Sequence, residues 1–227
     1  TLAAGASVDI IVSLTAVPET LPVGSYADTL VFSNLTSGAV FVRGATLEVE
    51  PHPPVEIYSF PLITDPGWTT EGDWAFGRPQ GLGGEYGGPD PSSGHSGNNV
   101  YGYNLSGDYE NNLDVVYLTT HALDCANIEN TRLSFYRWLG VENDTYDHAT
   151  IEVSADGVNW TEVWANGSSD VTDSSWQEVS YDISSIADEQ PTVYIRWGMG
   201  PTDGGWRYCG WNIDDISLTA NVCVQTP

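Results

Sequence analysis

Two adjacent aspartates, Asp214 and Asp215, have the clearest capacity for chemistry in this chain. They lie in the segment GWNIDDISLTA, where apolar and polar residues alternate as in a β-strand. Neighbouring side chains of a strand point to opposite faces, so we expect one carboxylate to face the interior or its margin. A buried carboxylate needs a partner, which can be a cation, an arginine such as Arg137 or Arg196, or backbone amides. Because the chain has only six basic residues, all arginines, the pattern favours a cation.

A glycine-rich stretch, GGPDPSSGHSGNNVYGYNLSGDY, offers more oxygen donors. Ca²⁺ collects carboxylate, amide and carbonyl oxygens from irregular backbone, although no EF-hand pattern occurs here. The alternative interpretation is an ordered corner whose glycines permit tight turns. On the calcium interpretation, the predicted ligands in this stretch are Asp90, Asn104 and Asp108, beside Asn98 and Asn99.

Catalytic chemistry has weak support in the sequence. Gly94-His95-Ser96-Gly97 is not a nucleophile elbow, and no histidine belongs to an H-E-x-x-H motif. A pair of catalytic carboxylates, as in glycosidases, remains an alternative, since two acidic side chains can approach each other in any fold. We therefore predict that the chain is not an enzyme.

The charge balance limits the classes of partner that the chain is expected to bind. The chain has 31 acidic and 6 basic residues, for a formal net charge of −25. Such a chain repels phosphate backbones and anionic lipids, so we expect no nucleic-acid partner and no membrane insertion. The absence of lysine, the single methionine and five N-x-S/T sequons are typical of an extracellular protein, secreted or at the cell surface.

The elements that must position these residues are strands. Residues 1–50 alternate apolar and polar side chains between Pro/Gly/Asn/Ser turns, which predicts four short strands. The proline-rich residues 51–55 form a predicted linker. Residues 56–227 continue as strands, including TRLSFYRWLGVE, HATIEVSADGVNWTEVWA, WQEVSYDIS and PTVYIRWGM, with Asp156-Gly157 as a hairpin signal. The pattern predicts an all-β antiparallel jelly-roll sandwich that follows a small β unit.

The ending Ile213-Asp214-Asp215-Ile216-Ser217-Leu218, followed by Cys223, resembles that of MAM-type domains and of secreted bacterial metallopeptidases similar to immune inhibitor A. Other pieces of the resemblance, which spans residues 56 to 223, are Gly72-Asp73-Trp74, His95-Ser96-Gly97, Leu133 to Trp138, Tyr146-Asp147, and Val153 to Gly157 before Trp160. Residues 1–50 resemble the back half of a bacterial immunoglobulin-like repeat. The resemblance implies a jelly roll with a structural calcium site, used for binding or for supporting a catalytic neighbour.

Within the acidic group Glu142, Asp144 and Asp147, a solvated loop face is the default interpretation, and Asp173 and Asp203 lie in other loops. Because Tyr146-Asp147 belongs to the resemblance, Asp147 is a further predicted calcium ligand, with anchoring of its loop as the alternative role.

The chain departs from animal MAM domains in its cysteines, so their disulfides do not transfer. In a jelly roll, the loops before the Leu133 strand and before the final strand can meet at one end. We therefore predict a Cys125–Cys209 disulfide that leaves Cys223 spare, with Cys209–Cys223 as the competing pair.

The aromatic residues divide into two groups. Those in strand patterns are expected in the core or on a sheet face: Trp138, Trp160, Trp164, Trp176 and Trp197. Those in loops either fill the core or form an exposed platform for a sugar ring or a peptide, and they are the predicted ligand-binding residues: Trp68, Trp74, Tyr86, Trp206 and Tyr208.

Together these features predict a non-catalytic, calcium-stabilised binding or accessory module of a secreted multidomain bacterial protein, a peptidase or an adhesin. Its expected partners are an extracellular protein or glycan and the neighbouring domains of the same precursor. The alternative is a carbohydrate-binding module of a polysaccharide-degrading enzyme.

Overall fold

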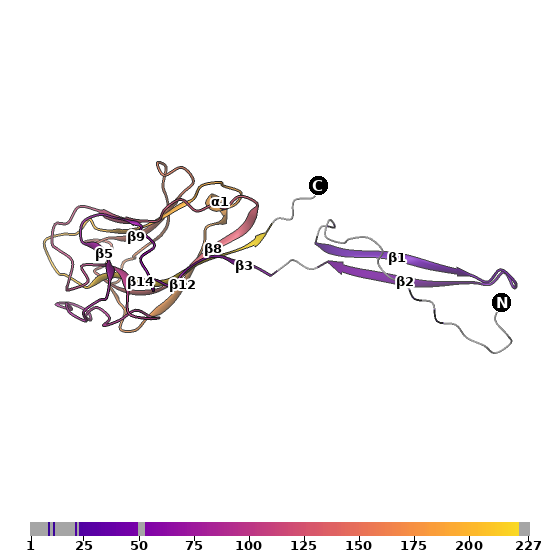
Figure 1. Cartoon of the computed structure of the whole chain (residues 1–227), viewed down its shortest axis with the longest axis horizontal. Coiled ribbons are helices and arrows are strands. Elements are labelled where there is room, and N and C mark those ends of the chain that lie inside the picture. The colour runs from indigo at the N-terminus through magenta and orange to yellow at the C-terminus, as the bar shows by residue number, and fades with distance from the viewer. Residues whose placement is uncertain (1–8, 10, 12–20, 22, 50–52, 223–227) are drawn as a thin grey trace. The chain divides into compact units, whose positions relative to one another are not determined.

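The computed structural model describes residues 9, 11, 21, 23–49 and 53–222 of the chain (Figure 1). The chain divides into two compact units. The first consists of residues 1–53 with 224–227, and the second consists of residues 54–223. Among the described residues, none belongs to a helix that is long and apolar enough to cross a membrane.

The described residues of the first unit include an antiparallel hairpin. Strands β1 (Gly24–Ser33) and β2 (Val40–Val49) pair in continuous register from Gly24 opposite Val49 to Ser33 opposite Val40. At the turn, the Asn34 side chain accepts hydrogen bonds from the amides of Thr36 and Ser37, a local pattern that favours chain reversal. Of the four strands predicted here, two are therefore present in the described residues, and the VDIIVSLTAV segment lies almost wholly outside them.

The second unit is an antiparallel β-sandwich, which confirms the predicted fold class. Its five-stranded sheet has the order β10-β9-β13-β7-β4. The strands are β4 (Thr69–Thr70), β7 (Val116–Thr119), β9 (Ala149–Ser154), β10 (Thr161–Ala165) and β13 (Tyr194–Met199).

The other sheet has seven strands built around β8 and β14, which pair antiparallel with each other (Figure 1). Strands β11 and β12 pair with β8, strands β3 and β6 pair with β14, and β5 pairs with β6. The strands are β3 (Val55–Phe60), β5 (Trp74–Gly77), β6 (Val100–Tyr103), β8 (Ile128–Val141), β11 (Val171–Thr172), β12 (Gln177–Asp182) and β14 (Gly210–Val222). A four-residue helix, α1 (Ser184–Ala187), follows β12.

Aromatic side chains join the two sheets. Trp197 of β13 packs edge-on against Phe135 of β8, with ring centroids 5.6 Å apart. Trp211 of β14 donates its indole N–H to the carbonyl of Gly198 in β13 at 3.0 Å. These side chains are almost fully buried, so their apolar area is removed from water and stabilises the contact between the sheets.

The predicted Cys125–Cys209 disulfide is wrong, because both residues are buried free thiols. Cys125 lies three residues before the start of β8, whereas Cys209 precedes Gly210, which is paired with Gly140 near the end of β8. The two cysteines are thus separated by nearly the length of that strand, about 40 Å at roughly 3.3 Å per residue. The prediction failed because β14 runs antiparallel to β8, so that the loop entering β14 lies where β8 ends. Cys223 lies outside the described residues.

Candidate functional site

The long connection between β5 and β6, residues 78–99, is the covering loop of the seven-stranded sheet. In β14, Trp211 and Ile213 face the core, so Asn212 and Asp214 point to the outer face. The covering loop lies on that face, because the Asn212 amide donates to Asp90 Oδ1 at 2.7 Å and the Ser96 amide donates to Asp214 Oδ2 at 3.0 Å. The Trp138 indole also donates to the Pro89 carbonyl at 3.1 Å. The glycine-rich stretch is therefore an ordered cover over polar side chains of the sheet.

Asp214 is fully buried, but beneath this loop and not between the sheets. Burial raises its pKa to about 6, while amide hydrogen bonds from Ser96 and Asp215 oppose the shift. Asp215 lies where the register of β14 shifts and has a left-handed φ of 49°. Backbone amides thus partner Asp214, as the third interpretation from sequence proposed.

The alternative arginine partners are engaged elsewhere. Arg137 pairs with Asp173 at 2.9 Å, and Arg196 pairs with Glu152 at 2.6 Å. An ion pair with Asp214 or Asp215 is therefore not formed by either arginine.

The predicted ligands of the glycine-rich stretch do not converge on one point. Asp90 binds Asn212, Asp108 accepts the amides of Gly84 and Glu85 at 2.6 and 2.9 Å, and Asn104 donates to the Asp108 carbonyl at 2.7 Å. Asp108 thus fixes a turn of the covering loop, whereas Asp90 ties this loop to β14 through Oδ1 and keeps a buried Oδ2 without a partner in the described residues. A calcium role for Asp90, Asn104, Asp108, Asp214 or Asp215 stays a prediction.

His95 and Ser96 both bind Asp215. His95 Nδ1 lies 2.7 Å from Asp215 Oδ2, and the Ser96 hydroxyl donates to Asp215 Oδ1 at 2.5 Å. The serine hydroxyl therefore points to the carboxylate and not to the imidazole that a nucleophilic serine would need as its base. This constellation fastens the covering loop to β14.

Three carboxylates from two loops do converge, at the end of the sandwich where β8 ends and β9 begins. One oxygen each of Glu142, Asp147 and Asp203 lie within 4.8 Å of one another, so this cluster could hold a metal ion. Asp147 is fully buried, and its oxygens accept the Tyr109 hydroxyl at 2.5 Å and the Asp203 amide at 2.8 Å. Sequence analysis named Asp147 as a calcium ligand and grouped it with Glu142 and Asp144, but it left Asp203 in a separate loop.

An open pocket of about 390 Å³ lies over this cluster, and we call it the acidic pocket. It is lined by Glu142, Asn143, Tyr146, Asp170, Asp203, Gly205 and Trp206. Burial, followed by the charge of the neighbouring Asp147, raises the pKa of Glu142, and burial also raises the pKa of Asp147. Such shifts arise where carboxylates crowd together away from water, and a bound cation would reverse them.

The predicted aromatic platform is largely core. Trp68, Trp74 and Tyr208 are at most 5% exposed, so for these three residues the predicted ligand contact is wrong. Trp206, by contrast, is 48% exposed and stacks on Tyr86 with ring centroids 4.6 Å apart. Loop position in the sequence could not separate these cases, because loops at a sandwich end pack inward as well as outward.

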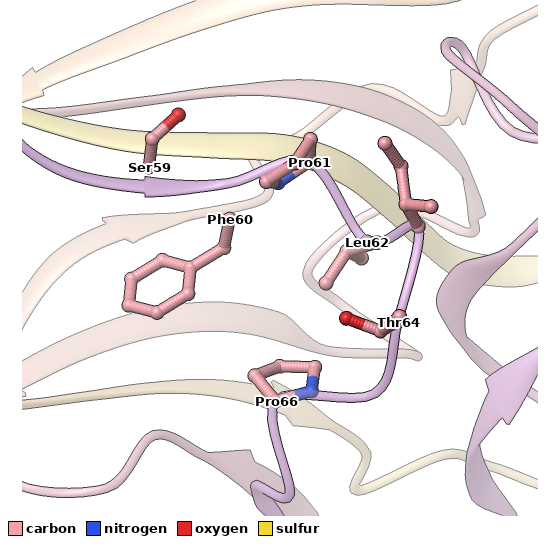
Figure 2. A pocket seen from close by; sticks show the side chains of 7 residues that line it. Ser59, Phe60, Pro61, Leu62, Thr64 and Pro66 are labelled. Atoms are coloured by element: carbon pink, nitrogen blue, oxygen red, sulfur yellow. The ribbon is translucent and has the colours of Figure 1, made fainter.

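A second pocket, of about 130 Å³, lies between the end of β3 and the loop that follows it. Figure 2 shows Phe60, Leu62 and Pro66 among its mostly apolar lining residues. It contains no ionisable side chain and is smaller than the pockets of roughly 300 Å³ or more that hold small molecules. The acidic pocket is therefore the better candidate site.

Comparison with known proteins finds similarity to part of a protein that is named as a peptidase. No family model matches it. Bacillopeptidase F of Bacillus subtilis (strain 168) is 29% identical over 160 residues, which are 67% of this chain and 10% of that protein. The chain therefore matches about a tenth of the length of that relative.

Two solved structures are similar at low identity. The CBM22-1 xylan-binding domain of Paenibacillus barcinonensis Xyn10C has a TM-score of 0.47 and 13% identity, covering 75% of this chain and 97% of that one. The K3 cleaved adhesin domain of Lys-gingipain from Porphyromonas gingivalis w83 has a TM-score of 0.40 and 16% identity, covering 73% and 99%.

Proposed function

We propose that this chain is a non-catalytic, calcium-stabilised binding module of a secreted multidomain bacterial protein, a peptidase or an adhesin. The observation that carries the proposal is the acidic pocket, an open cavity with a carboxylate floor and an exposed indole on its wall. Concave sites with a few convergent polar groups are the usual form of ligand sites. The match to a part of Bacillopeptidase F supports a place beside a peptidase in a longer chain.

Calcium enters this proposal through Glu142, Asp147 and Asp203. Glu142 is 6% exposed and lines the open pocket, and its carboxylate oxygens are not among the buried side-chain atoms that lack a partner in the described residues. Carboxylates that crowd together are stabilised by a cation, and hard oxygen donors are what Ca²⁺ prefers. The donor set thus fits a calcium ion, which would supply positive charge to balance these carboxylates.

The alternative function is a carbohydrate-binding module, and one observation favours it. The Trp206 ring is held in place by Tyr86 on one face and is half exposed at the pocket wall. A fixed, amphipathic ring of this kind can stack on the apolar face of a sugar.

The test uses the whole chain on two arrays, one of polysaccharides and one of extracellular-matrix proteins. We expect a signal on at least one array, and we expect Trp206→Ala to reduce it at least about tenfold, because a central aromatic residue is a typical binding hot spot. Trp176→Ala is the matched control, since Trp176 lies outside the acidic pocket. Blank arrays for the folded wild-type protein would leave a spacer without a ligand as the better explanation.

A further inference from the structure

The floor and the walls of the acidic pocket belong to the same short segments of chain. Glu142 and Asp147 flank the wall residues Asn143 and Tyr146, and Asp203 lies three residues before Trp206. The Asp203 amide donates to Asp147, so the two segments are also joined at the floor. Any ion that draws the three carboxylates together therefore fixes the positions of the walls.

The carboxylates at the floor of the acidic pocket form no ion pair with the described basic side chains. The ion pairs of the described residues use the carboxylates of Asp215, Asp173, Glu152 and Glu85, and none of these lines the acidic pocket. Glu142 is 6% exposed and lines the pocket, and its carboxylate oxygens, which are not among the buried atoms without a partner, are open to the pocket. This largely buried side chain, open to the pocket and outside every ion pair of the described residues, is an observation separate from the clustering of acids, and it favours a cation at this point.

Three protein carboxylates leave room on such a cation. Ca²⁺ takes roughly six to eight oxygen ligands at about 2.3–2.6 Å, and Asp147 is held from the protein side by Tyr109. The remaining positions face the pocket, whose volume of about 390 Å³ far exceeds that of one ion. Hydroxyl or carboxylate oxygens of a ligand fit these positions.

The Trp206 ring, which forms one wall of the acidic pocket, is held in one orientation by its neighbours. Its ring stacks on Tyr86 with an interplanar angle of 13°, and the neighbouring Arg207 forms an ion pair with Glu85. The Tyr86 amide also donates to the Arg207 carbonyl at 3.2 Å. An aromatic face prepared before binding reduces the ordering cost of a flat ligand.

We propose that the acidic pocket binds a saccharide in a calcium-dependent manner, with a sugar ring on Trp206 and its hydroxyl oxygens on an ion held by Glu142, Asp147 and Asp203. The proposal rests on the proposed function and names its ligand class. A lysine or arginine side chain of a protein partner would also suit the carboxylates, but it would leave most of the cavity unfilled.

The experiment measures binding of the full chain to a polysaccharide array of xylan, galactan, pectin and chitin fragments, once in millimolar Ca²⁺ and once in EDTA. The strongest binder is then titrated by calorimetry, with tryptophan fluorescence as a second readout. We expect the affinity to fall at least about tenfold in EDTA, within the usual range of coupling between two ligands. Glu142→Gln should cause the same loss in Ca²⁺, whereas the exposed Glu162→Gln should not.

Circular dichroism at the binding temperature shows whether each sample is folded. If Glu142→Gln does not fold, the comparison of wild type in Ca²⁺ and in EDTA still tests the calcium dependence. Saccharide binding that is equal in Ca²⁺ and EDTA would overturn the calcium dependence and leave the proposed function standing. Binding to the protein array alone would overturn the proposal that the ligand is a saccharide. Blank arrays throughout would overturn both proposals.

Discussion

At the scale of single residues, Asp90 is the acid whose protonation the structure constrains most directly. It is 3% exposed, and its Oδ1 accepts the Asn212 side-chain amide. Its Oδ2 and the Asn212 Oδ1 are buried without partners. A proton on Asp90 would supply a donor to this pair of oxygens, so both groups are best satisfied when the carboxyl is neutral.

Asp90 should therefore make the second unit less stable as the pH rises. Burial raises its pKa to about 8, from 3.8, so between these values the folded state keeps a proton that the unfolded chain has lost. Stability then falls with increasing pH, by at most about 1.4 kcal/mol per pH unit from this group. Asp90→Asn keeps the shape and removes the titration, so its melting temperature should exceed that of wild type at pH 7.5.

The measurement is a series of melting curves from pH 5 to pH 8. The difference between Asp90→Asn and wild type should grow with pH, whereas the exposed Asp144→Asn serves as the control. A difference that does not change with pH would show that Asp90 is already ionised in the folded protein.

Some residue roles were accessible from the sequence and others were not. The alternation in β14 predicted that one of Asp214 and Asp215 would face the interior or its margin, whereas Asp214 is buried on the outer face of the sheet. It did not predict that the burial comes from a loop on the outer face, because periodicity describes a strand and not what covers it. The cluster of Glu142, Asp147 and Asp203 joins residues about sixty positions apart, and only the pairing of strands brings them together.

At the scale of elements, the covering loop depends on close backbone approach at Gly94. A Cβ at this position would lie 2.6 Å from Asp214 Oδ2 and from the carbonyl oxygens of Ser96 and Asn99. Backbone and a buried carboxylate cannot move aside cheaply, so a methyl group here must displace the loop.

Gly94→Ala should destabilise the second unit by about 1–3 kcal/mol, the usual cost of overpacking. Gly167→Ala is the matched control, because nothing lies within 4 Å of its Cβ position and its φ is not left-handed. Denaturant unfolding of both variants measures the difference. Equal stability of the two variants would mean that the loop is not clamped on the sheet at Gly94.

The elements themselves were the most predictable part of the fold. The alternating segments became β8, β9, β10, β12, β13 and β14, since period-two alternation reflects a strand with one buried face. The two-residue strands β4 and β11 gave no such signal, as they are too short to show a period.

At the scale of the whole molecule, a net charge of −25 increases the effect of a bound cation on the stability of the folded protein. Like charges on a compact chain repel one another, and a divalent ion at Glu142, Asp147 and Asp203 would remove part of that repulsion locally. An ion that binds only the folded state also stabilises it by mass action, by about 2.7 kcal/mol at a hundredfold excess over the dissociation constant.

We therefore expect millimolar Ca²⁺ to raise the melting temperature by several degrees relative to EDTA, in buffers of equal ionic strength so that general screening is the same. Glu142→Gln removes one donor of the cluster and should abolish most of this calcium-dependent increment. It should also be more stable than wild type in EDTA, because the neutral amide no longer repels Asp147 and Asp203. Asp214→Asn distinguishes the sites: if the calcium increment disappears in this variant and persists in Glu142→Gln, the stabilising ion lies beneath the covering loop, and the assignment to the acidic pocket is wrong.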